Sequence, residues 1–334
     1  MLKVGVIGFG YWGPNIVRNL TVLRETTVKT VCDVSSDATA RAKAMYPHLT
    51  VCQDYREVTH DPEIEAVAVV TPVSTHYEIA RHALENGKHV FVEKPFTASV
   101  SEAEKLIKLA KKNKLIIMVD HTFLFTGAVR KIKEVIDDNT LGSLYYYDAT
   151  RFSLGLVQQD INVIWDLAPH DFSILDHVIK DKPVALTASG IGHLQKDQET
   201  IAYITFLFER NFIAHIGVNW LSPVKIRTTM IGGQKKMLLW NDLDAEEKIK
   251  IYDKGVKIAS KEGIYRMLVD YRMGDMISPR VDQTEALKIE LIYFAQCIRD
   301  YETPINDGEA GLRVVKLLEA ADRSLRSGGK LVKL

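Results

Sequence analysis

The chain has 334 residues, with 43 Lys and Arg against 43 Asp and Glu, so its formal net charge is zero, and 46% of its residues are apolar. At roughly 150 residues per domain this length suggests about two domains, each large enough to bury a core without disulfides or metals. Proteins that bind nucleic acids carry an excess of basic residues, because phosphate contacts supply much of their affinity. The charge balance therefore excludes nucleic acid as an expected partner.

The apolar runs and the cysteines narrow the class further. No run approaches the roughly 18 uninterrupted apolar residues of a membrane span, and the N-terminal stretch Val4–Gly13 has no cleavage site of a signal peptide. The cysteines Cys32, Cys52 and Cys297 are odd in number and form no Cys-x-x-Cys pair, which argues against a disulfide framework or a zinc site. We expect a cytoplasmic protein with no membrane contact and no metal.

The first 120 residues alternate short β-branched runs with helical patterns. Such alternation predicts an α/β domain with a parallel, doubly wound sheet. In Ser101–Lys112, Ser101 and Glu104 form a capping-box pattern for one of the helices. The expected strands are Lys3–Ile7, Val28–Cys32, Ala66–Val70, His89–Val92 and Leu115–Val119.

Residues 121–334 show a different rhythm and are predicted to form a second, α+β domain with a large, mostly antiparallel open sheet. The run Phe212–Trp220 alternates apolar and other residues, as a strand with one buried face does. Helices on only one face would leave the other face apolar and exposed, so we expect a homodimer or homotetramer formed through this sheet. The expected helices are Ala128–Asp138, Glu285–Asp300 and Glu309–Ser327, and the expected strands are Ser143–Thr150, Pro183–Ile191, Ile201–Phe208, Phe212–Trp220, Lys225–Ile231 and Lys235–Leu239.

A glycine pattern directly follows the first expected strand. Gly8, Gly10 and Gly13 precede a helix that begins near Pro14, and Asp33 ends the second strand 20 residues after Gly13. The pattern alone could be an ordinary glycine-rich turn, but this context is typical of a dinucleotide-binding Rossmann domain. The backbone would hold the diphosphate at the helix N-terminus, and Asp33 would bind the adenosine ribose.

Asp33 also bears on the choice of cofactor. A carboxylate at this position repels a 2′-phosphate, and the following Val34-Ser35-Ser36 offers no Arg to pair with one. We therefore expect NAD rather than NADP.

Two further strand ends carry polar residues. The fifth strand leads into Glu93-Lys94-Pro95, and the fourth ends in Thr71-Pro72, with His76 a few residues on. The carboxyl ends of parallel strands are where ligands bind in such sheets. Taken alone, Glu93-Lys94-Pro95 is more typical of a surface ion pair than of a binding site.

A last pattern lies in the second domain, at Trp165–Asp171. Asp166 and His170 are four residues apart, so they share one face of a helix. Pro169 fits the first turn of a helix, which makes Asp166 a plausible N-cap. On spacing alone, these two residues could be a cap and a structural histidine.

The chain resembles the Gfo/Idh/MocA oxidoreductases, which include glucose–fructose oxidoreductase and inositol dehydrogenase. The resemblance rests on the glycine pattern, Thr71-Pro72 with His76, Gly87–Pro95, Asp166 with His170, and Pro304–Leu312. It implies a Rossmann domain followed by an α/β domain with an open sheet, and an NAD-dependent dehydrogenase. The expected cofactor contacts are Gly8, Gly10, Tyr11, Trp12, Gly13, Asp33, Thr71, Pro72, His76, Glu93 and Lys94.

The same resemblance places Lys94 against the substrate and Asp166 and His170 beside the reacting carbon. Oxidation of a secondary alcohol needs a base for the hydroxyl proton and a cation near the developing alkoxide. His170 is our predicted base, Lys94 the cation, and Asp166 the residue that orients His170 or holds a substrate hydroxyl. In some family members the lysine is assigned the proton transfer instead.

The substrate class follows from where the chain departs from its relatives. Many sugar dehydrogenases of the family have an Asn and an Arg where this chain has Asp120–Phe125. This run and Asn162–Asp171 look more like members that oxidise the C3 hydroxyl of nucleotide-activated amino sugars, such as UDP-GlcNAc or its uronic acid. Candidate substrate contacts, each with a structural role as the alternative, are His121, Arg151, Asn162 and Trp165.

Three other functions remain open. The chain could reduce a keto sugar with NADPH, or it could be a free-sugar or inositol dehydrogenase. It could also be a non-catalytic, ligand-sensing regulator, which the joint presence of Lys94, Asp166 and His170 disfavours.

Overall fold

The computed structural model describes residues 1–155, 157–158, 160–194, 198–258 and 269–334. The chain forms two compact units, the first made of residues 1–125 and 284–316 and the second of residues 126–283 and 317–334. We predicted two continuous domains, 1–120 and 121–334. In the structure the first unit extends to residue 125 and also includes residues 284–316. This return of the chain to the first unit is fixed by packing: Phe294 contacts Phe91 of the first unit, with ring centroids 5.6 Å apart.

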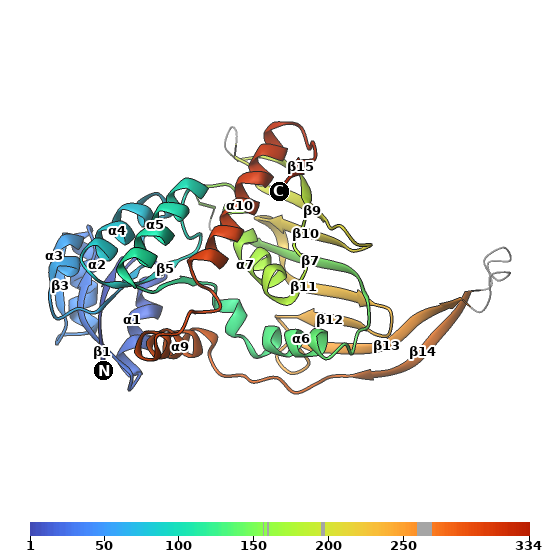
Figure 1. The fold of residues 1–334 in the computed structure, drawn as a ribbon, viewed down its shortest axis with the longest axis horizontal. Helices are drawn as coiled ribbons and strands as arrows, with labels where there is room; N and C mark the ends of the chain where they lie inside the picture. Colours follow the sequence, from blue (N-terminus) through green and yellow to red (C-terminus); the bar gives the residue numbers. More distant parts are fainter. Residues whose placement is uncertain (156, 159, 195–197, 259–268) are drawn as a thin grey trace. The chain divides into compact units, whose positions relative to one another are not determined.

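The first unit contains a six-stranded parallel sheet in the order β3-β2-β1-β4-β5-β6 (Figure 1). This confirms the predicted Rossmann sheet; only the three-residue β3 lay outside the expected strands. The strands are β1 (Leu2–Ile7), β2 (Thr26–Cys32), β3 (Thr50–Cys52), β4 (Ala66–Val69), β5 (His89–Glu93) and β6 (Ile117–Asp120). The helices of this unit are α1 (Gly13–Val22), α2 (Ser36–Met45), α3 (Tyr55–His60), α4 (Val73–Glu85), α5 (Val100–Asn113), the 3-10 turn η1 (Thr122–Phe125) and α9 (Ala286–Asp300).

The start of α5 differs from its prediction. Ser99 is the N-cap, and its Oγ accepts a hydrogen bond from the backbone N–H of Glu102 at 3.3 Å. Glu102 Oε2 accepts in return from the N–H of Ala98 at 3.2 Å. The predicted pairing of Ser101 with Glu104 is wrong by two residues, because two Ser-x-x-Glu patterns overlap here and the helix begins at the earlier one.

The second unit contains a nine-stranded sheet in the order β14-β13-β12-β11-β7-β10-β9-β8-β15. Strands β7 and β10 pair in parallel, and the other pairs are antiparallel, which confirms the predicted mostly antiparallel sheet. The strands are β7 (Leu144–Leu154), β8 (Ala185–Ile191), β9 (Ile201–Leu207), β10 (Ile213–Asn219), β11 (Leu221–Gly233), β12 (Met237–Asn241), β13 (Ile249–Ile258), β14 (Val269–Ile277) and β15 (Val332–Lys333). The sequence analysis did not predict β13, β14 or β15.

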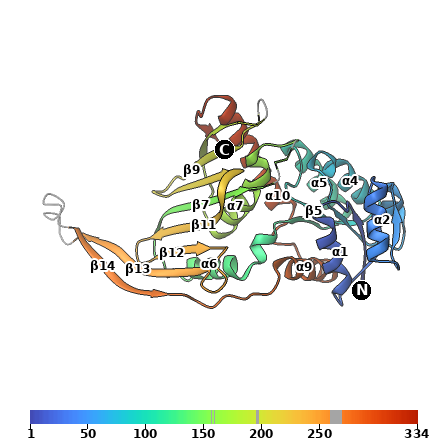
Figure 2. The same cartoon turned by 180° about the vertical axis from the view of Figure 1, so that it is seen from behind.

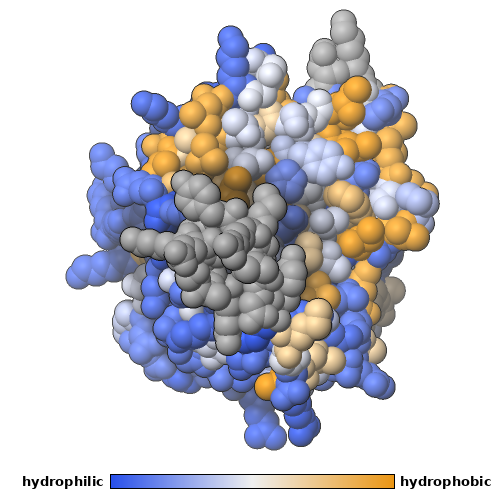
Figure 3. Space-filling view, turned by 90° about the vertical axis from the view of Figure 1, so that its right-hand side faces the viewer, coloured by the Kyte–Doolittle hydropathy of each residue, from blue (hydrophilic) through white to orange (hydrophobic). Residues whose placement is uncertain are grey.

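In the described part of the second unit, helices lie on one face of this sheet and none lies on the opposite face. Helices α6 (Gly127–Asp137) and α7 (Val163–Val178) lie on the face toward the viewer in Figure 1, and Figure 2 looks onto the opposite face. Strand β9 shows the consequence: Ile204 and Phe206 are buried, whereas Tyr203 and Leu207 are 43% and 38% exposed. Figure 3 shows apolar side chains, in orange, along the right-hand side of its view.

Helix α10 (Gly308–Arg326) ends the helical part of the chain, and it passes from the first unit to the second after residue 316. In the part of the chain that the structure describes, no helix is both long and apolar enough to span a membrane.

Candidate functional site

The three glycines of the first loop each fill a separate steric role. Gly8 has a φ of +105°, and a Cβ there would lie 2.1 Å from the carbonyl oxygen of Val70. A Cβ at Gly13 would lie 2.2 Å from the Gly8 oxygen, so its absence lets α1 pack against the end of β1. At Gly10, no described atom lies within 4 Å of the Cβ position, so the backbone there borders open space.

The N-terminus of α1 faces this loop. Its N-cap is Trp12, and no side chain of the described residues caps the helix, while Pro14 occupies the first turn. A helix start without a side-chain cap leaves N–H groups and the positive end of the helix dipole for an anion. The loop and the helix therefore fit the diphosphate of a dinucleotide.

Asp33 follows β2 and is held by two backbone N–H groups. Its Oδ2 accepts from Phe9 at 2.6 Å, and its Oδ1 accepts from Ser35 at 2.9 Å. Arg41 of α2 lies on the other side of Phe9 and donates from Nη2 to its carbonyl oxygen at 3.1 Å. Arg41 was not among the predicted site residues, because only the three residues after Asp33 were considered for pairing with a phosphate; an arginine in the helix that follows was the available signal.

The residues after β4 and β5 meet at His76, which is 1% exposed. Its Nδ1 lies 2.9 Å from the Pro95 oxygen, and its Nε2 lies 2.8 Å from the Thr71 oxygen. Burial lowers the pKa of His76, and a neutral ring donates to one of these carbonyls. Both ring nitrogens face backbone carbonyl oxygens, so His76 links the segments that follow β4 and β5. Lys94, which directly precedes Pro95, is half-buried.

The remaining predicted cofactor residues lie on the same loops. Tyr11 is 84% exposed, and Trp12 donates its indole N–H to Asp120 Oδ2 at 3.0 Å. Glu93, at the end of β5, pairs in register with Asp120 at the end of β6. Pro72 is exposed at the N-cap of α4.

In the second unit, α7 carries the Asp166 and His170 pattern. Its N-cap is Asn162, whose Oδ1 accepts from the N–H groups of Ile164 and Trp165, both at 3.1 Å. The suggestion that Asp166 is the N-cap is therefore wrong. Pro169 lies within the helix, where its cost is the loss of one backbone hydrogen bond and some strain.

Asp166 is oriented by a residue from the sheet. The indole N–H of Trp220 donates to Asp166 Oδ2 at 2.9 Å, and Trp220 is 1% exposed. His170, one turn after Asp166, is half-buried. The sequence analysis used Trp220 only as an apolar residue of an alternating strand and missed its polar N–H group.

The predicted substrate contacts have internal partners. Arg151 is 5% exposed and donates to Asp171, from Nε at 2.7 Å and from Nη2 at 3.1 Å. Asn162 Nδ2 donates to Glu199 and Asp322, and Trp165 Nε1 donates to Asp322 Oδ2 at 2.8 Å. The partners of Arg151, Asn162 and Trp165 all lie within the second unit, as the structural alternative expects. In the first unit, His121 is likewise buried, at 1% exposed.

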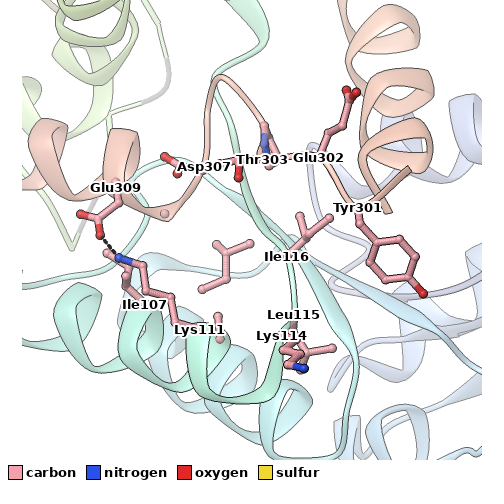
Figure 4. A pocket seen from close by; sticks show the side chains of 14 residues that line it. Ile107, Lys111, Lys114, Leu115, Ile116, Tyr301, Glu302, Thr303, Asp307 and Glu309 are labelled. Carbon is pink, nitrogen blue, oxygen red and sulfur yellow. Dashed lines mark hydrogen bonds and ion pairs between the residues drawn. The ribbon is translucent and has the colours of Figure 1, made fainter. Parts of the chain in front are cut away.

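A pocket lies within the first unit. Figure 4 shows it between the end of α5, the start of β6 and the segment after α9, with Lys111 and Glu309 paired at 2.6 Å. It lies at the amino end of β6, whereas Asp33, Thr71 and Glu93 of the same unit lie at the carboxyl ends of their strands. Among the described residues, no group of His, Cys, Asp and Glu side chains could hold a metal ion.

Two family models match the chain. A model described as an oxidoreductase family with an NAD-binding Rossmann fold (GFO_IDH_MocA) matches residues 2–121. The GFO/IDH/MocA C-terminal domain matches residues 129–238. Together these ranges cover more than half of the 334 residues.

Three dehydrogenases illustrate the similarity. The scyllo-inositol 2-dehydrogenase (NAD(+)) of Bacillus subtilis is 26% identical over 98% of this chain and 95% of its own. The NADP(+) enzyme IolW of the same organism is 28% identical over 60% of this chain and 58% of its own. UDP-N-acetylglucosamine 3-dehydrogenase of Acidithiobacillus ferrooxidans is 24% identical over 94% of both chains. A solved structure of this last enzyme, GnnA, covers 98% of both chains with a TM-score of 0.81 and 23% identity.

Proposed function

Because the chain belongs to the Gfo/Idh/MocA family of NAD(P)-dependent oxidoreductases, we propose that it oxidises the C3 hydroxyl of a nucleotide-activated amino sugar, such as UDP-GlcNAc or its uronic acid. The supporting observation is the nearly full-length similarity to a relative named UDP-N-acetylglucosamine 3-dehydrogenase. The departure of Asp120–Phe125 from the pattern of free-sugar dehydrogenases favours the same substrate class.

NAD is the proposed cofactor. The two N–H groups on Asp33 fix a carboxylate where the adenosine ribose binds in Rossmann domains, and that charge opposes a 2′-phosphate. Arg41 works in the opposite sense, because its guanidinium also reaches Phe9 and would attract a phosphate. We therefore propose that the enzyme binds NAD more tightly than NADP, and that Arg41 makes this difference in affinity smaller.

The proposed chemistry uses Lys94, Asp166 and His170. When bound, the nicotinamide ring takes the hydride that leaves the sugar carbon. His170 accepts the hydroxyl proton, since an imidazole titrates near neutral pH. Lys94 stabilises the developing alkoxide through its positive charge, and Asp166, held by Trp220, orients His170 or a substrate hydroxyl. The products are a ketone, a proton and the reduced cofactor.

The relatives named as inositol dehydrogenases support a second candidate, a free inositol or sugar as substrate. A thermal-shift screen in the presence of NAD separates the two, because a ligand of the folded state raises Tm by mass action. The panel contains UDP-N-acetylamino sugars, their uronic acids, UDP-glucose, free N-acetylglucosamine and inositols. A shift with the UDP-amino sugars alone supports the proposal, and a shift with inositols alone favours the alternative.

A further inference from the structure

Two buried carboxyl groups meet at the carboxyl edge of the sheet in the first unit. Asp120 ends β6 and is 1% exposed, and Glu290 of α9 is 0% exposed. Asn306 links them: its Nδ2 donates to Glu290 Oε1 at 2.9 Å and to the carbonyl oxygen of Val119, the residue before Asp120, at 2.6 Å, although 170 residues separate Asp120 and Glu290 in sequence. Two ionised carboxylates in contact without water would repel each other strongly, so close burial favours a proton between them.

The surroundings of Asp120 suit a carboxylate. Its Oδ2 accepts from the Trp12 indole at 3.0 Å, and its Oδ1 accepts from the hydroxyl of Thr122. Burial raises the pKa of Asp120, while these hydrogen bonds and the positive charge of Lys94 act to lower it. Two donors and a nearby cation stabilise negative charge on this residue.

The surroundings of Glu290 suit a neutral acid. Its Oε1 accepts from Asn306 Nδ2 at 2.9 Å, and its buried Oε2 makes no hydrogen bond of ordinary geometry with the described residues. Burial, then the charge of Asp120 and a smaller effect of Glu93, raise the pKa of Glu290 well above its usual value, while the hydroxyl of Thr122 acts to lower it. A proton on Oε2 would give this oxygen a partner, because it could donate to Asp120.

The other charged groups near α9 do not change this balance. Arg18 of α1 binds Glu285, the N-cap of α9, through Nη1 at 3.1 Å and Nη2 at 2.6 Å. Asn19 of α1 donates to the same carboxylate at 2.9 Å. Arg18 and Asn19 therefore bind the N-cap residue of α9, which lies more than one helical turn before Glu290.

We propose that Asp120 and Glu290 share one proton, carried by Glu290, and that this pair acts through Trp12 to position the glycine loop. Trp12 lies between Gly10 and Gly13, so its bond to Asp120 ties the loop to β6 and α9. Loss of the proton places a second charge behind Asp120, and cofactor affinity falls at alkaline pH. That consequence rests on the NAD binding proposed above, whereas the shared proton does not.

The shared proton is tested first, without cofactor. Infrared difference spectra of the wild type against Glu290→Gln at neutral pH should show the carbonyl band of a protonated acid in the wild type only. In urea unfolding at the same pH, Glu290→Gln should fold, because its amide can donate to Asp120 as the acid does. Asp120→Asn should be the less stable variant, because it removes the negative charge that Trp12 and Thr122 stabilise and puts an NH2 group where one of these two donors needs an acceptor.

Three results would overturn this half of the proposal. The first is the absence of the acid band. The second is an increase in stability for both amide variants, which indicates two ionised groups. The third is a Glu290→Gln variant that fails to fold or is less stable than Asp120→Asn, which places the proton on Asp120.

The positioning role is tested by NADH fluorescence titrations. The Kd for NADH should rise with pH in the wild type but stay flat in Glu290→Gln. Asp120→Asn and Trp12→Phe should each raise Kd about tenfold, as loss of one hydrogen bond to a charged group does. If Asp120 acts through Trp12, the double variant should be no worse than the weaker-binding single variant. The positioning role would be overturned if the increases in Kd of the two single variants multiply in the double variant, or if the Kd of the wild type does not depend on pH. The infrared result tests the shared proton independently of these titrations.

Discussion

The indole N–H of Trp220 lies 2.9 Å from Asp166 Oδ2, so a carboxylate on α7 is oriented by a residue 54 positions further along the chain. We predict that Trp220→Phe lowers kcat by about tenfold with a smaller effect on KM, because a hydrogen bond to a charged group contributes roughly 1.5–3 kcal/mol. Trp240→Phe is the matched control, since Trp240 is also buried, at 2% exposed, in the same sheet on β12. Equal kcat losses in both variants would show that Trp220 acts only through packing.

Cofactor choice is predicted to depend on Asp33 and Arg41 in opposite directions. Asp33→Ala should raise the Kd for NAD by about tenfold, through loss of charged hydrogen bonds, and should narrow the preference for NAD over NADP. Arg41→Ala should widen that preference, because it removes the cation beside Phe9. Titration of each variant with both cofactors measures the two effects. Unchanged constants for Asp33→Ala would contradict the assigned role.

The Arg151–Asp171 pair is predicted to be structural. Both side chains are at least nine-tenths buried, and removing one partner of such a pair costs about 3–5 kcal/mol, because the other charge is left uncompensated. Arg151→Met should therefore lower the free energy of unfolding by this amount, and the double variant with Asp171→Leu should recover part of it. A stable Arg151→Met variant with a raised KM for the sugar would instead support the substrate contact first predicted for Arg151.

The buried imidazole of His76 predicts a loss of stability in mild acid. Because burial lowers the pKa of His76 in the folded state, the unfolded chain binds the proton more readily. The stability that neutral His76 contributes is fully present above the ordinary histidine pKa of about 6.5. It is lost as the pH falls through the lower pKa that His76 has in the folded protein. His76→Gln should be less stable at pH 7, and its Tm should fall less between about pH 7 and 5. In His76→Gln, the decrease of Tm with falling pH should become smaller but should not disappear, because burial also lowers the pKa of His89 and His177.

The open face of the nine-stranded sheet predicts self-association. Ile213 and Met230 are 45% and 44% exposed on this face, beside Tyr203 and Leu207, and contiguous apolar surface of this kind marks interaction sites. Light scattering of the wild type should give the mass of a dimer or tetramer. Ile213→Glu combined with Met230→Glu should shift the mass toward the monomer. A monomeric wild type would contradict the prediction.

The features that could be predicted from sequence are those encoded locally. The glycine spacing and the alternation of runs identified the Rossmann sheet, because each depends on neighbouring residues. The N-cap of α7 was misplaced because Pro169 suggested a first turn, whereas Asn162 satisfies the N–H groups one turn earlier.

The features that escaped prediction depend on distant partners. Asp171 pairs with Arg151, and Asn306 links Glu290 to the end of β6, only after the chain folds. No spacing rule connects residues from different elements. The sequence therefore identified candidate catalytic and binding side chains. It could not distinguish side chains that contact a ligand from those that form ion pairs or hydrogen bonds within the protein.

The most direct test of the proposed reaction follows the hydride itself. The wild type is incubated with NAD and UDP-GlcNAc, or its uronic acid, carrying deuterium at C3, and the NADH formed is analysed by mass spectrometry. We expect NADH that contains one deuterium, with none transferred from sugar labelled at C4. Unlabelled NADH from the C3-labelled sugar, or turnover with inositols and none with the nucleotide sugars, would contradict it.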